Sequence, residues 1–138
     1  MLRIGKAARI ALAAMVELAR AGDECLTTSG ISERYGISPH HLTKILQQLA
    51  KAGLVQTTRG IGGGHRMARS PRNLTLADVI EAVRGPMEPS SRSPGARPDG
   101  DEGVQVGPEL ASVFSEIDQQ IVATLRSISI ATIVKKMT

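Results

Sequence analysis

Hydrogen-bonding side chains crowd one face of the segment 39–52. Apolar residues recur in this segment at three- and four-residue spacings, which predicts a helix with one buried face. The apolar residues are Leu42, Ile45, Leu46 and Leu49. The opposite face carries His40, His41, Thr43, Lys44, Gln47, Gln48 and Lys51.

The side chains of this polar face are suited to hydrogen bonding with the edges of bases. Lysine donates to the acceptors of guanine, and threonine bonds a base edge or contacts the methyl group of thymine. The alternative is an ordinary solvated helix face. The neighbouring elements distinguish this alternative from a face that contacts bases. We predict base contacts from the first turns of the helix and phosphate contacts further along it. The predicted base contacts are His40, His41, Thr43 and Lys44, and the predicted phosphate contacts are Gln47, Gln48 and Lys51.

A second helix and a tight turn are predicted directly before this segment. Residues 27–29 offer hydroxyl groups to the first turn of a short helix that ends near Gly36. Ser38 caps the next helix, and Pro39 occupies its first position, where a missing N–H costs nothing. Two helices joined in this way form a helix-turn-helix. Thr28, Ser38 and Pro39 are therefore added to the predicted DNA contacts.

Two strand-like segments, Leu54–Arg59 and His65–Arg69, follow and predict a hairpin. Four of the five residues between them are glycine, which allows a tight turn with exposed backbone. Arg59 is predicted to enter a minor groove, whose negative potential attracts arginine. A nucleotide-binding loop is not favoured, because such a loop needs a helix after its glycines. The backbone groups predicted to approach phosphates are those of Gly60, Gly62, Gly63 and Gly64.

The residues needed for an enzyme or a metal site are not assembled in the sequence. Cys25 is the only cysteine, which excludes an intrachain disulfide and a CxxC metal site. Its apolar neighbour Leu26 favours a packed small side chain over a redox sensor. The only histidines, His40, His41 and His65, have no cysteine or carboxylate at ligand spacing. We therefore expect no enzymatic activity and no metal or cofactor.

Charge is divided unevenly along the chain. Residues 1–72 hold 11 Lys and Arg against 4 Asp and Glu, whereas residues 73–138 hold 6 against 9. The basic half indicates contact with a polyanion such as double-stranded DNA, although a solvated charged surface is the alternative. No apolar run approaches the roughly 18–20 residues that span a membrane, and the N-terminus lacks the core of a signal peptide. A cytoplasmic location without membrane contact is therefore expected.

The remaining segments complete a mainly α fold with a small β-hairpin wing. Helices are predicted over 5–20 and 76–84, the second capped by Thr75. Residues 85–108 contain five of the seven prolines and five glycines, which predicts a flexible loop. We predict three parts: a winged helix-turn-helix domain (1–84), this loop (85–108) and a dimerisation helix with a tail (109–138).

The third part carries an apolar stripe at coiled-coil spacing. The stripe exceeds what the small N-terminal domain covers, so a partner helix is expected on it. The predicted dimerisation residues are Leu110, Phe114, Ile117, Ile121 and Ile128.

Several segments together resemble the IscR/NsrR-type transcription regulators of the Rrf2 family. The resemblance covers residues 1–84 almost continuously, and the glycine-rich TRGIGGG is its most specific part. The segment 38–44 (SPHHLTK) is most similar to the nitric-oxide-sensing branch, and the long helix with 128–131 (ISIA) resembles the family's dimerisation helix and tail. The other matching segments are 6–12 (KAARIAL), 31–38 (ISERYGIS), 42–46 (LTKIL), 51–55 (KAGLV) and 76–83 (LADVIEAV).

The resemblance implies a homodimeric, sequence-specific DNA-binding regulator, with repression as the expected action. It places the helix 39–52 in the major groove and Arg59 in the minor groove. Many relatives hold an iron–sulfur cluster through three loop cysteines, but residues 85–108 contain none, and Ala8 stands where some relatives supply a carboxylate. Two explanations stay open: a branch without a cluster, or a chain whose loop cysteines were replaced. The alternative function is a regulator whose long helix docks another protein, with DNA binding secondary.

Overall fold

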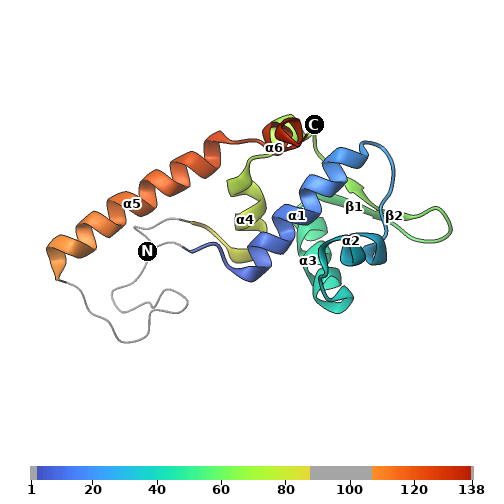
Figure 1. Ribbon diagram of the computed structural model, residues 1–138, viewed down its shortest axis with the longest axis horizontal. Coiled ribbons are helices and arrows are strands. Elements are labelled where there is room, and N and C mark those ends of the chain that lie inside the picture. The colour runs from blue at the N-terminus through green and yellow to red at the C-terminus, as the bar shows by residue number, and fades with distance from the viewer. Residues whose placement is uncertain (1–2, 88–106, 138) are drawn as a thin grey trace.

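The computed structural model describes residues 3–87 and 107–137 of the 138-residue chain. It is mainly helical with one antiparallel hairpin, which confirms the predicted fold class (Figure 1). In chain order the elements are α1 (Lys6–Ala21), α2 (Thr28–Tyr35), α3 (Pro39–Lys51), β1 (Val55–Thr58), β2 (Gly64–Met67), a 3-10 turn (Pro71–Asn73), α4 (Leu76–Arg84), α5 (Pro108–Ser127) and α6 (Ile130–Lys136).

Short polar residues begin the helices where the sequence predicts them. The Thr27 hydroxyl oxygen accepts a hydrogen bond of 3.0 Å from the N–H of Gly30 at the start of α2. Thr75 and Asp78 form a reciprocal capping box at the start of α4. Gly36 ends α2 with φ of 64°, a left-handed conformation that favours glycine. Each N-terminal cap contributes about 1 kcal/mol to the stability of its helix.

The hairpin strands are shorter than predicted. Each has four residues, and their register pairs Val55 with Met67 and Thr58 with Gly64. At Leu54, just before the first strand, the N–H bonds to the carbonyl of Leu49 in α3, while the carbonyl accepts from the N–H of Ala68 just beyond the second strand. Gly64, predicted to lie in the turn, thus belongs to the ladder.

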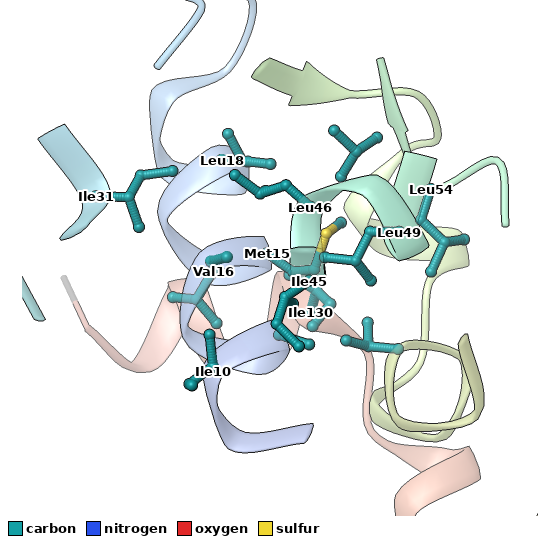
Figure 2. Packing of buried hydrophobic residues seen from close by; sticks show 14 of the residues in the cluster. Ile10, Met15, Val16, Leu18, Ile31, Ile45, Leu46, Leu49, Leu54 and Ile130 are labelled. Atoms are coloured by element: carbon teal, nitrogen blue, oxygen red, sulfur yellow. The ribbon is translucent and has the colours of Figure 1, made fainter. Parts of the chain in front are cut away.

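The main core surrounds α1. Met15 and Leu18 are fully buried and pack with the apolar face of α3, which supplies Leu46 and Leu49 (Figure 2). Burying each such side chain stabilises the fold by about 1.5–3 kcal/mol. The core therefore holds α3 by one face and leaves its polar face outside.

The apolar tail 130–134 is a helix, α6, and it packs into this core. Ile130 is fully buried among the residues around Met15 (Figure 2). Its N–H donates to the carbonyl of Leu74 at 2.8 Å, and the N–H of Leu76 donates to the carbonyl of Ile128 at 2.9 Å. The end of the chain is thus tied to the segment that enters α4.

A second apolar cluster joins α5 to α1 and α4. Val122 and Leu125 on α5 are buried against Ala8 of α1 and Ile80 of α4. An ion pair of 3.0 Å between Arg126 and Glu81 crosses the same contact. The opposite end of α5 extends away from the rest of the described chain (Figure 1).

Most of the predicted loop, residues 88–106, lies outside the described residues. At its described start, Met87 is buried in the second cluster beside α5. The proposed division into three parts stays a prediction, and the packing of α6 on α1 links the third part to the first.

Candidate nucleic-acid interface

The turn between α2 and α3 is fixed by local hydrogen bonds. The hydroxyl of Ser32, a buried residue, donates to the carbonyl of Ile37, and the N–H of Ile37 donates to the carbonyl of Ser32 at 3.1 Å. Ser38 then accepts a hydrogen bond of 3.4 Å from the N–H of His41, and Pro39 opens the helix. This local bonding sets the direction in which α3 leaves the turn.

The exposed face of α3 is the polar one, as its periodicity predicts. Pro39, His40, Thr43, Lys44 and Gln47 are exposed, and His41 is half-buried. The Thr43 hydroxyl donates to the carbonyl of Pro39 at 2.8 Å. Its methyl group and an oxygen lone pair therefore stay available, so it can accept from a base but has already used its donor.

The hairpin forms a wing whose turn requires glycine. The N–H of Gly63 donates to the carbonyl of Gly60 at 3.0 Å, which closes the turn. A Cβ at Gly63 would lie 2.3 Å from the carbonyl oxygen of Thr58, a severe clash. Arg59, Gly60 and Gly62 are exposed, whereas Gly63 and Gly64 are partly covered. The wing tip therefore presents glycine backbone and the fully exposed side chain of Ile61 beside the exposed Arg59.

His65 connects the wing to α2. Its Nε2 lies 2.9 Å from the hydroxyl of Thr28, and its Nδ1 lies 3.0 Å from the hydroxyl of Thr57. Two backbone hydrogen bonds of 2.8 Å also join His65 to Leu26. Burial lowers the pKa of the imidazole below its ordinary value of 6.5. The predicted contact Thr28 is thus placed beside the wing.

A buried carboxylate connects α1 to α2, and sequence reasoning missed it. Glu17 is 8% exposed, accepts hydrogen bonds from the Tyr35 hydroxyl at 2.7 Å and from Arg20 at 3.1 Å, and forms an ion pair of 3.2 Å with Arg34. Burial, followed by the hydrogen bond to Glu17, raises the pKa of Tyr35 above its ordinary value. The partners lie 3 to 18 residues from Glu17, so only the packed fold reveals the cluster.

The predicted dimerisation stripe lies along α5 and the residue that follows it. Leu110 is 46% exposed, and Phe114, Ile117, Ile121 and Ile128 are half-buried. Val122 and Leu125 of α5 pack inward, and Ile121 of the stripe packs partly against the same cluster. The helix therefore has one covered face and one largely open face.

The donor residues do not fit a thiolate-bound cluster. Among residues 3–87 and 107–137, no three His, Cys, Asp or Glu side chains lie close enough together to hold a metal ion. Cys25, the only cysteine in the sequence, is half-buried between α1 and α2. Clusters need about four thiolates or close substitutes.

Comparison of the sequence with known proteins identifies its family and several relatives. Residues 4–136 match the Rrf2 family, described as iron-dependent transcriptional regulators. The chain is 34% identical to BadM of Rhodopseudomonas palustris over 134 residues, which covers 97% of this chain and 82% of that protein. It is 32% identical to the HTH-type transcriptional regulator IscR of Xenorhabdus nematophila over 137 residues, covering 97% and 80%.

Solved structures agree with the fold. CymR of B. subtilis, described as the global cysteine regulator, superposes with a TM-score of 0.80 at 25% identity, covering 99% of this chain and 98% of that one. IscR of T. potens superposes with a TM-score of 0.78 at 26% identity, covering 99% and 89%. The chain belongs to the Rrf2 family of winged helix-turn-helix transcriptional regulators.

Proposed function

We propose that the chain is a sequence-specific DNA-binding repressor that acts as a homodimer. The observation that carries the proposal is α3, whose apolar face is held in the core while its other face presents hydrogen-bonding side chains to solvent. A helix held in this way fits the major groove, where each base pair shows a distinct pattern of donors and acceptors.

Within this proposal some polar side chains at α3 contact bases and others contact phosphates. Lys44 donates to guanine, and Thr43 offers a methyl group and an acceptor because its proton is already bonded to Pro39. Ser38 keeps its own hydroxyl proton for a phosphate, since its oxygen accepts from His41. The helix thus carries both base-reading and positioning groups.

The wing supplies the second contact. Arg59 enters the adjacent minor groove, and the bare turn at Gly60 and Gly62 lets the backbone approach phosphates. The link from His65 to Thr28 fixes the wing relative to α2, so the two contacts are presented together.

Dimerisation is proposed through the open face of α5. Its partly exposed apolar residues, with Leu110 at 46%, would be covered by the same helix of a second copy. Two copies would place two recognition helices on half-sites about one helical turn apart. A heterologous protein on this face is the competing occupant, and the oligomeric state of the purified chain decides between them.

We propose further that this regulator senses its signal without a cysteine-ligated cluster and acts in the cytoplasm, with no catalytic activity. The single cysteine supports the first point. None of the described helices, within residues 3–87 and 107–137, is long and apolar enough to cross a membrane.

The direct test is selection of bound DNA. Purified protein is mixed with fragmented genomic DNA, the bound fragments are sequenced, and the most enriched sequence is checked by mobility shift. We expect a shared motif with two related halves. Enrichment without any shared motif would contradict sequence-specific binding.

A further inference from the structure

Two hollows beside α3 join into one groove. The first, of about 410 Å³, is lined by Lys44 and Lys51 of α3, by Ala7 of α1 and by Val83 of α4. The second, of about 380 Å³, is again lined by Ala7 and Val83, and adds Arg3, Lys6 and Arg84. Because both hollows share two residues, they adjoin; we call them together the α1–α4 groove.

Every charged side chain that lines the α1–α4 groove, along the residues that the structure describes, is a cation. Lysine or arginine comes from three different elements, and no carboxylate lines either hollow. The ion pairs formed at Glu17 and Glu81 use other arginines, namely Arg20, Arg34 and Arg126. A hollow lined by one sign of charge concentrates the opposite charge.

We propose that the α1–α4 groove binds phosphates of the DNA backbone beyond the bases that α3 reads. The proposal rests on the proposed function, because Lys44 and Lys51 belong both to α3 and to the groove. A duplex that receives α3 in its major groove carries its phosphates along the sides of that helix. Lys6 and Arg84 would extend this track by neutralising phosphates without reading sequence.

The continuity with α3 favours DNA over a protein segment. A competing occupant is an acidic stretch of a second copy, such as the start of α5 with Glu109 and Glu116. Removing the cations of the groove would have a different effect for each of these two occupants. Removing phosphate contacts reduces the salt dependence of DNA binding, whereas removing a protein contact changes the oligomeric state.

The test compares the full-length chain with a Lys6→Gln/Arg84→Gln variant. Both side chains are exposed, so the variant should keep its unfolding midpoint. Dissociation constants are measured by fluorescence anisotropy against salt concentration, on the selected operator and on a scrambled duplex of equal length. Lys136→Gln is the control for loss of a cation elsewhere, because Lys136 is exposed on α6, which lies on the opposite edge of the molecule from α2 and α3 (Figure 1).

In the Lys6→Gln/Arg84→Gln variant we expect the plot of log K against log salt to become shallower on both duplexes. The slope should fall by about 0.9 for each phosphate that the variant no longer neutralises. The Lys136→Gln control and a charge-retaining Lys6→Arg/Arg84→Lys variant should keep the wild-type slope.

An unchanged slope in the neutral variant, with operator binding intact, would overturn this proposal alone. Conversion of the neutral variant to a monomer in sedimentation would overturn it in favour of a protein contact. A wild-type chain that binds neither duplex would overturn both this proposal and the proposed function.

Discussion

At the residue scale, three side chains separate base contacts in the major groove from the contact in the minor groove. Lys44→Ala and His41→Ala should each relax base preference by roughly 1–3 kcal/mol, because each removes a predicted contact to a base edge. Arg59→Ala should weaken binding with a smaller change in base preference, since it reads the minor groove. The measurement is the dissociation constant on the operator and on its single-base variants. Three variants that all bind the operator like wild type would exclude the proposed docking.

The histidine of the wing predicts a pH dependence of stability. Burial lowers the pKa of His65 below 6.5, so the unfolded chain binds more protons as the pH falls through that value. Stability contributed by the neutral imidazole is therefore fully present above about pH 6.5 and declines below it. Urea unfolding between about pH 5 and 8 measures this decline.

A His65→Asn variant is the control for this pH dependence. Asparagine keeps hydrogen-bonding groups near Thr28 but does not titrate. Its free energy of unfolding should therefore decline less steeply at low pH than that of the wild type. If the free energy of unfolding changed with pH in the same way for both proteins, protonation of His65 would not be the cause of the decline.

The sequence predicted the exposed face of α3 and part of the exposed wing, but not the partial covering of Gly63 and Gly64 or the contacts that hold either element in place. Local periodicity determines the faces of α3, so Lys44 and Thr43 lie outside as expected. The partners of His65 and Glu17 lie up to 37 residues away in the chain, and no local pattern encodes such pairs.

At the scale of elements, α5 should hold the dimer together. Phe114→Glu/Ile121→Glu would place charges on the open face of the helix and should give a monomer that binds operator poorly. Sedimentation at micromolar concentration measures the assembly. The control is Ala123→Glu, an exposed position of the same helix outside the predicted stripe. A wild-type chain that is itself monomeric would refute the homodimer.

The contact of α6 with α1 predicts a large fall in stability when its buried side chain is shortened. Ile130→Ala removes most of a fully buried side chain and should reduce the free energy of unfolding by about 2–5 kcal/mol. Leu110→Ala is the control, because Leu110 is 46% exposed and should change the stability of the monomer by about 0.5 kcal/mol or less. Chemical unfolding compares them. Equal losses of unfolding free energy in the two variants would mean that α6 contributes little to the core.

The sequence located α1 to α4 well, and the ends of the strands and the helix α6 less well. Helices such as α1 and α3 have enough turns for a periodic pattern, and their predicted ends differ from the observed ones by about one residue. The tail that forms α6 has only seven helical residues, too few for a clear period. Its burial depends on tertiary packing against Met15, which local sequence does not show.

At the scale of the whole molecule, the chain should not assemble a cysteine-ligated iron–sulfur cluster. A dimer would supply only two thiolates, one Cys25 from each copy, where about four are needed. Anaerobic reconstitution with iron and sulfide, followed by desalting, should leave no stoichiometric iron or sulfide. Bound iron with visible charge-transfer absorption that persists in Cys25→Ala would contradict this expectation.

The most direct test of DNA recognition is the ratio of two dissociation constants at one salt concentration. One is for the selected operator and the other is for a scrambled duplex of the same length and composition. For the wild-type chain the operator should bind at least about 10³-fold more tightly, and Lys44→Ala should reduce that ratio. A ratio near one for the wild type would contradict sequence-specific DNA binding by this chain.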